Sequence, residues 1–138
     1  MRVAGKVCKS RKDQFWLCTI PILDLMVQAE TKEEIPEMVK DAIELLVDDV
    51  NFNAHVTLSG NIVFISSEES KKLVALMLKR QRQKHGLTLE QVAALLNTKS
   101  INDYAQYEQG KHVPSLDNLT RFLEAINPSI QPFISCPS

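Results

Sequence analysis

The sequence predicts an α+β protein in which a small sheet with one helix is followed by an all-helical segment. Over most of residues 1–66, apolar residues alternate with polar ones or form short runs, a pattern typical of strands. From about residue 67 onward they recur at intervals of three and four, which is typical of amphipathic helices. The 138 residues suffice for two very small domains. We therefore expect one domain at 1–66, a second at 67–128 and a tail at 129–138.

The N-terminal segment is expected to have the order β-β-β-α-β. The strands are predicted at 2–9, 15–20, 25–29 and 62–65. Val3 and Val7 fall on one face of the first strand, and Pro21 closes the second. Short connections between consecutive strands indicate antiparallel neighbours.

One helix interrupts these strands. Thr31 and Glu34 have the spacing of a capping box and predict its start. Its predicted apolar stripe consists of Ile35, Met38, Val39, Ala42, Leu45, Leu46 and Val50. A single stripe suits packing against one face of a small sheet, with the acidic residues of the other side in solvent.

The C-terminal segment is predicted to contain four helices. Ser66 and Glu69 form a second possible capping box, which we place at the domain boundary. The helices are expected at 71–84, from Thr88 to about 96, at 100–109 and at 116–126. Predicted helix ends are Gly86, the run 97–99, Gly110 and Asn127-Pro128. Val92, Ala93, Leu95 and Leu96 form the predicted buried face of the second helix, and Tyr104 and Tyr107 point inward from the third.

Composition excludes several functional classes. No apolar run approaches the length of about 20 residues that a membrane span needs, and the first residues lack a signal-peptide pattern. Three cysteines without C-x-x-C spacing and three scattered histidines make no metal site. We expect a cytoplasmic protein with no metal, no cofactor and no membrane association.

The net charge of −1 hides an asymmetry between the two segments. Residues 1–66 hold seven Lys/Arg and ten Asp/Glu, whereas residues 67–138 hold nine and seven. Six basic residues lie within 71–84 without an acidic one: Lys71, Lys72, Lys79, Arg80, Arg82 and Lys84. This cluster has two interpretations, a contact with phosphate or a solvated helix face.

Two short helices joined by a tight turn are an arrangement that the major groove of DNA accepts, since the groove is about 12 Å wide and admits one helix. The second of them is predicted to expose Ser100, Asn102, Asp103 and Gln106. Asn and Gln side chains can pair with both edges of adenine. Thr98 and Lys99 precede this helix and can reach phosphate. The simpler interpretation of Asn102 and Gln106 is ordinary polar exposure.

Residues 86–96 (GLTLEQVAALL) and 107–119 (YEQGKHVPSLDNL) resemble the Cro/repressor (XRE-type) helix-turn-helix family. The resemblance implies base-facing roles for Ser100, Asn102 and Gln106, with Asp103 beside them on the same helix. It implies positions near the DNA backbone for Thr88, Lys99 and Lys111, and an ion pair between Glu108 and Arg82. The sequence departs from the family in a turn one residue longer before the second helix and in Leu89, where Gln is common.

The N-terminal segment is similar to the HicB family of bacterial antitoxins. The similarity rests on a strand ending at residues 19–21 (TIP), a helix opening at 31–34 (TKEE), residues 41–46 (DAIELL) and residues 102–110 (NDYAQYEQG). It implies a partial RNase H-like fold and a small basic HicA-like partner toxin that cleaves mRNA. The family's usual Gly near the third strand and Asn in the helix are not evident. Phe15, Trp16 and Leu17 are candidates for the toxin interface or for the core. Trp16 points opposite to Phe15 and Leu17 along a strand, so we expect one set to be exposed and prefer Trp16 as the toxin contact.

These patterns predict a type II antitoxin that neutralises an mRNA-cleaving toxin through residues 1–66 and represses its own operon as a homodimer or higher oligomer on operator DNA. The alternative is an XRE-type transcriptional repressor whose N-terminal domain senses a ligand or only dimerises. A third hypothesis is that the protein is an enzyme. Asp13 and Asp24 flank the second strand at opposite ends and make no convergent carboxylate cluster, so we expect no catalytic residue.

Overall fold

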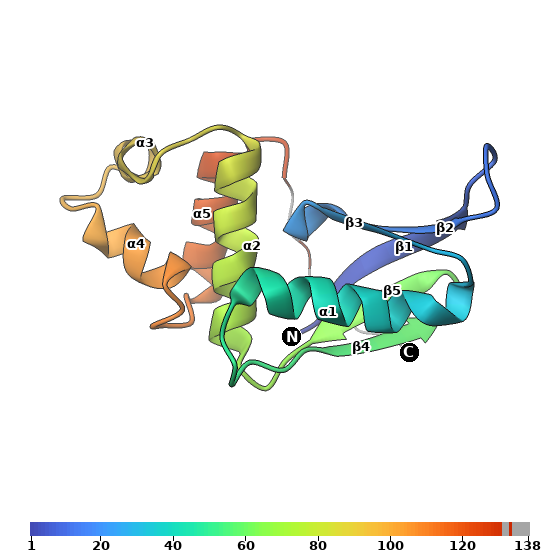
Figure 1. Ribbon diagram of the computed structural model, residues 1–138. Helices are drawn as coiled ribbons and strands as arrows, with labels where there is room; N and C mark the ends of the chain where they lie inside the picture. Colours follow the sequence, from blue (N-terminus) through green and yellow to red (C-terminus); the bar gives the residue numbers. More distant parts are fainter. Residues whose placement is uncertain (131–132, 134–138) are drawn as a thin grey trace.

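A computed structural model describes residues 1–130 and Phe133 (Figure 1). In this part of the chain one five-stranded sheet precedes most of the helices. The elements are β1 (Val3–Lys9), β2 (Trp16–Ile20), β3 (Leu25–Ala29), α1 (Ile35–Val47), β4 (His55–Ser59), β5 (Ile62–Ser66), α2 (Ser70–Lys84), α3 (Leu89–Leu95), α4 (Asn102–Glu108) and α5 (Leu116–Ile126). The predicted α+β class is confirmed. None of the described helices combines the length and the apolar character needed to cross a membrane.

The sheet has the order β3-β2-β1-β5-β4, and every neighbouring pair is antiparallel, as predicted for the first three strands. Val3 and Val7 lie on its buried face. The predicted order β-β-β-α-β is wrong by one strand, because β4 also pairs with β5 through a turn at Gly60 and Asn61. Gly60 has a φ of 61°, which favours glycine in such a two-residue hairpin turn.

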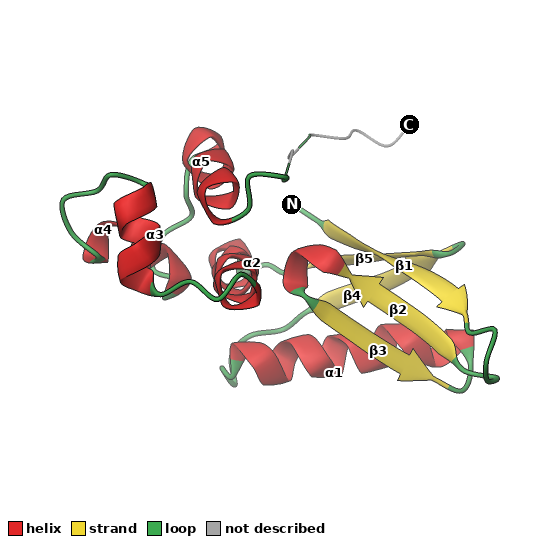
Figure 2. Ribbon diagram, turned by 90° about the horizontal axis from the view of Figure 1, so that it is seen from above, coloured by secondary structure: helices red, strands yellow, loops and turns green. Residues whose placement is uncertain are grey.

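Helix α1 covers one face of the sheet, as Figure 2 shows. Its buried row is Ile35, Val39 and Ile43, each with no exposed surface. The predicted stripe was partly wrong, because Leu45 is 79% exposed and Val50 is fully exposed, and Met38 also faces solvent. At about 100° per residue, a row at intervals of four places Leu45 roughly on the far side of the helix from Ile43.

Two of the three predicted capping boxes do not form. Residues 32–34 make a 3₁₀ turn ahead of α1, and Thr31 makes no side-chain cap there. Pro36 occupies the first turn of α1, where its missing N–H is tolerated. Before α2, the Ser67 hydroxyl instead donates to the Asn53 carbonyl at 2.8 Å and accepts from the Glu69 amide at 3.1 Å.

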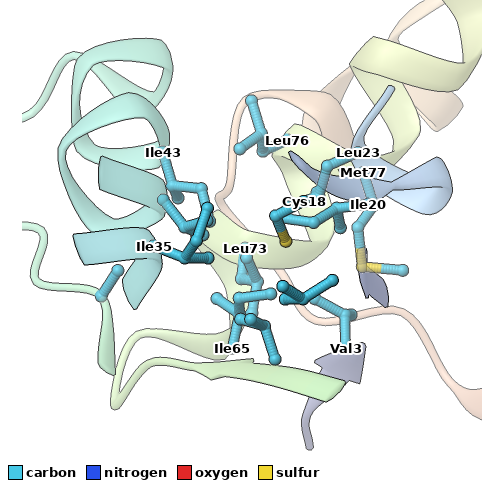
Figure 3. Close-up of a cluster of buried hydrophobic side chains, with 14 of the residues drawn as sticks. Val3, Cys18, Ile20, Leu23, Ile35, Ile43, Ile65, Leu73, Leu76 and Met77 are labelled. Carbon is cyan, nitrogen blue, oxygen red and sulfur yellow. The ribbon is translucent and has the colours of Figure 1, made fainter. Parts of the chain in front are cut away.

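Helix α2 belongs to both cores of the molecule. Leu73, Leu76 and Met77 pack with the sheet and α1 (Figure 3), whereas Val74 and Leu78 pack with α3, α4 and α5. The two halves therefore share one helix rather than being joined by a linker (Figure 1).

Polar contacts strengthen this junction at the turn of residues 21–23. The amide of Gln81, which is 3% exposed, donates to the carbonyls of Pro21 and Ile22 at 2.8 and 3.0 Å. The Arg80 guanidinium donates to the carbonyls of Leu23 and Asp24 at 2.9 and 2.6 Å. In the predicted tail, Ile130 packs on the helical core and Phe133 is exposed. The predicted positions 131–132 and 134–138 lie outside the described residues.

Candidate nucleic-acid interface

Helix α3 begins at a complete capping box. The Thr88 hydroxyl accepts from the Gln91 amide at 3.1 Å, and the Gln91 side chain accepts from the Thr88 amide at 2.8 Å. Both contacts satisfy backbone donors that the first turn of a helix leaves free. The box that the sequence predicted here is confirmed. Thr88 is thus occupied in capping, with its exposed side facing solvent beside the start of α3.

The turn between α3 and α4 is fixed by local hydrogen bonds. Asn97 has a φ of 58°, the left-handed conformation that ends a helix. The Thr98 hydroxyl lies 3.2 Å from the Ala93 carbonyl and 3.1 Å from the Ser100 carbonyl. The Ser100 hydroxyl in turn accepts from the Asn102 amide at 3.2 Å, next to the first residue of α4. These contacts set the angle at which α4 leaves the turn.

Helix α4 buries one side and presents the other. Tyr104 has no exposed surface and meets the Phe122 ring edge-on at 5.2 Å, and half-buried Tyr107 lies 5.1 Å from the same ring. Burial, followed by the charge of Glu108, raises the pKa of Tyr104, which keeps its hydroxyl neutral. Both tyrosines point inward, as predicted.

The opposite side of α4 carries the side chains that the sequence predicted to face bases. Ser100, Asn102 and Asp103 are exposed, and Gln106 is half-buried with its amide donating to the Asp103 carbonyl at 3.3 Å. Together with exposed Lys99 they line the start of α4, the part of a recognition helix that reaches base edges. We call Lys99, Ser100, Asn102, Asp103 and Gln106 the reading surface. Lys111 is also exposed, past the end of α4.

Sequence reasoning missed an apolar member of this surface. Ile101 is 38% exposed between Ser100 and Asn102. An apolar side chain there can contact the methyl group of thymine. Ile101 lies one residue before α4 begins, and its position next to the helix start was the only indication in the sequence. Neither strand alternation nor helical spacing identifies such a residue. The structure also corrects Leu95, predicted to be buried but 58% exposed at the end of α3.

An ion pair with little solvent exposure holds α4 against α2. Arg82 and Glu108 side chains are 15% and 6% exposed, and the Nε–Oε2 distance is 2.8 Å. A second guanidinium nitrogen donates to Oε1 at 3.0 Å, and a third donates to the Leu87 carbonyl at 2.9 Å. Hydrogen bonds to Glu108 raise the pKa of Arg82 further above its usual range. The pair implied by the family resemblance is therefore present.

The basic cluster of α2 is not a continuous phosphate-binding face. Lys72 pairs with Asp49 and Glu69, and hydrogen bonding to Lys72 lowers the pKa of the Asp49 carboxyl. Arg80 and Arg82 bind carbonyls and Glu108, as described above. Three of the six cations thus stabilise the fold. The family resemblance implied the Glu108 partner of Arg82, whereas Asp49 and the carbonyls that Arg80 binds lie 23 to 57 residues from their cations, so the sequence did not reveal these contacts. The other three, Lys71, Lys79 and Lys84, are exposed to solvent.

Comparison with known proteins bears on this half of the molecule. Residues 78–133 match the family model described as helix-turn-helix, which spans the end of α2 together with α3, α4 and α5. The C-terminal half of the chain contains a helix-turn-helix domain. The match supports DNA binding and transcription regulation of the XRE type. No curated protein matches the chain.

Proposed function

We propose that the chain is the antitoxin of a type II HicAB-like pair and that it represses its own operon. In this proposal the helix-turn-helix domain binds operator DNA in the cytoplasm through the reading surface. The sheet with α1 binds a small basic HicA-like toxin and covers the site at which that toxin cleaves mRNA. The observation that carries the regulatory part is the exposed polar start of α4, held in a domain that matches the helix-turn-helix family.

A protein partner suits the N-terminal half better than a small ligand. The larger of the two described grooves has a volume of about 210 Å³ and is lined by charged residues such as Asp49, Lys72 and Lys79. Sites for small molecules are mostly apolar and measure roughly 300–1,000 Å³. The sequence similarity to HicB and the acidic residues of α1 support a basic partner, since complementary charge speeds and directs association. The partial RNase H-like character of this half is part of the same proposal.

The DNA-binding form is proposed to be a dimer. One recognition helix reads only a few base pairs, and two related by a two-fold axis read half-sites about 34 Å apart. The operator is then expected to be a palindrome. An XRE-type repressor with another N-terminal partner would share this geometry, so the partner and not the operator distinguishes the two functions.

Growth rescue tests the antitoxin role. The short reading frame beside this gene is induced alone and then together with this protein or its Asn102→Ala variant. We expect toxicity alone and rescue by both proteins, because neutralisation uses the N-terminal half. A neighbour without toxicity, or toxicity that the parent does not relieve, would contradict the antitoxin role and leave a DNA-binding regulator.

Operator binding tests the reading surface. Asn102→Ala and Gln106→Ala are each expected to lower specific affinity by about 1–3 kcal/mol while weak nonspecific binding persists. Gln109→Ala, exposed at the other end of α4, is the matched control and should bind like the parent. Parent affinity should fall with salt at a log–log slope of about −0.9 per neutralised phosphate. Unchanged operator affinity in both variants would show that other residues read the bases.

A further inference from the structure

The outer side of α1 carries a second row of residues besides the buried one. Glu34, Met38, Asp41, Leu45 and Asp48 follow one another at intervals of four, three, four and three, and we call them the α1 outer stripe. This spacing places them along one side of a helix, as in the seam of a coiled coil. Leu45 is 79% exposed and Met38 is 39% exposed, and the three acids are exposed as well.

The fold leaves this stripe uncovered in the described residues. Helix α1 lies against the sheet by its inner row, α2 crosses its C-terminal end, and α3, α4 and α5 lie on the far side of α2 (Figure 1). The inner row already supplies the contacts that hold α1 in place, with Ile35, Val39 and Ile43 fully buried. Neither Met38 nor Leu45 belongs to the described core cluster, so each apolar side chain is available to a partner.

Charge determines which partner fits. Residues 31–54 hold seven acidic and two basic residues, and one of the two, Lys40, is bound to Glu44 and Asn53. The stripe itself has three acids and no base. The excess of acids therefore favours a basic surface on the stripe, whereas an acidic one would be repelled.

The face of the sheet that no described helix covers offers the opposite charge. Met26 and Ile62 are 64% and 43% exposed there, so this face also presents apolar side chains. Its charged neighbours are basic: Lys6 is exposed on β1, and the Arg2 guanidinium lies 4.5 Å from the centre of the Phe64 ring. A basic partner is disfavoured on this face. The difference in charge between the two surfaces therefore favours the α1 outer stripe as its docking site.

Trp16 is less exposed than the sequence predicted for a toxin contact. It is half-buried on the same face as Cys18 and Ile20, packed against the sheet core, with the ammonium groups of Lys9 and Lys32 at 5.8 and 5.7 Å from its ring. Two cations beside Trp16 make its surroundings a poor match for a basic protein.

We propose that the α1 outer stripe is the docking surface for a small basic protein. Leu45 and Met38 enter apolar depressions of that partner, and Glu34, Asp41 and Asp48 pair with Lys or Arg around them. Such an arrangement, an apolar centre with a charged rim, is usual for protein interfaces. The proposal rests on the proposed function only for the partner's identity as a toxin. The basic charge and the apolar depressions of the partner are inferred from the stripe itself.

Site-specific cross-linking in the cells that make the protein tests the proposal. A photoreactive phenylalanine analogue replaces Leu45 in one full-length chain and Met26 in a matched control chain. We expect the Leu45 position, and not the Met26 position, to give an adduct with one small basic protein, identified by mass spectrometry. The absence of an adduct at position 45, the same adduct at both positions, or an adduct with an acidic protein would overturn the proposal.

Titration of the purified partner then measures the contribution of the stripe. Leu45→Lys is expected to weaken binding about tenfold or more, since it places a cation among acids that the partner's cations need. Met26→Lys makes the same change of side chain on the sheet and should bind within about twofold of the parent. Both residues are exposed, so circular dichroism should show folded proteins. Equal effects of the two substitutions would contradict docking on α1.

The same experiments separate this inference from the proposed function. If a basic partner docks on the stripe but is not toxic, the result would support the docking surface and contradict the antitoxin role. A toxin that this protein neutralises, but whose binding is unaffected by Leu45→Lys and whose adduct forms at Met26, would keep the antitoxin role and refute the surface.

Discussion

The two halves of the molecule differ in what holds them together. Among the described residues, sixteen buried side chains form the core between the sheet, α1 and α2, whereas eight form the core of the helical half. The helical half compensates with specific polar contacts: the Arg82–Glu108 pair, the Thr88 capping box and the Thr98 hydroxyl in its central turn. A half stabilised mainly by apolar burial tolerates loss of a single polar group better than one positioned by a few such contacts. The position of α4 is therefore the property most sensitive to single substitutions.

Loss of one member of the ion pair should have the largest effect. Glu108→Ala leaves the Arg82 guanidinium with little solvent and no counter-ion, and breaking a buried pair in this way costs about 3–5 kcal/mol. Urea unfolding measures the loss. The double variant Arg82→Met with Glu108→Leu removes both charges and should recover much of the stability. A loss below about 1 kcal/mol for Glu108→Ala would mean that the helical half does not depend on this contact.

A cavity on the sheet side of α2 tests how far the two halves unfold together. Leu73→Ala should cost roughly 2–5 kcal/mol, because Leu73 is fully buried in the sheet core. Trp16 is the single tryptophan and lies in the sheet half, while both tyrosines lie on α4, so fluorescence and near-ultraviolet dichroism report the halves separately. We expect both signals to shift by the same amount, since α2 belongs to both cores.

The control for this cavity is Leu45→Ala, which removes an exposed side chain and should change stability by less than about 0.5 kcal/mol. A tyrosine transition that stays in place while the tryptophan transition moves would separate the halves into independently unfolding units.

The buried amide at the junction should have an intermediate effect. Gln81→Ala leaves the carbonyls of Pro21 and Ile22 without their donor, at a cost of about 1–3 kcal/mol. Gln83→Ala, two residues along the same helix but exposed, is the matched control. Equal stability of the two variants would show that the turn at 21–23 is held by apolar contacts alone.

Much of the helical half could be predicted from sequence because its signals are local. Gly86 and Gly110 adopt φ values of 66° and 70° at helix ends, and the Thr88 box spans four residues. The sheet half was harder. Strand β4 was missed although residues 55–59 alternate polar and apolar, because only two apolar residues, Val56 and Leu58, carry the pattern. The outward turn of Leu45 depends on which row of α1 faces the sheet, and the presence of apolar residues on two sides of the helix leaves that choice open.

In the candidate site, too, features set by local sequence could be predicted and contacts between distant residues could not. Exposure of Asn102 follows from the inward position of Tyr104, which helical spacing predicts. The internal roles of Lys72 and Arg80 depend on carbonyls and carboxylates that only folding brings near. A cluster of charges in a sequence thus says little about which of them face solvent.

Removal of one helix cap should have the smallest effect and tests whether a capping pattern is stabilising only where it forms. Thr88→Ala removes the acceptor for the Gln91 amide and should cost about 1 kcal/mol in urea unfolding. Thr31 has the same spacing to a glutamate but makes no capping bond, so Thr31→Ala should cost a few tenths at most. Equal losses at the two positions would mean that a box forms ahead of α1 as well. A loss at Thr88 alone would show that Pro36 and the 3₁₀ turn, rather than a threonine cap, begin α1.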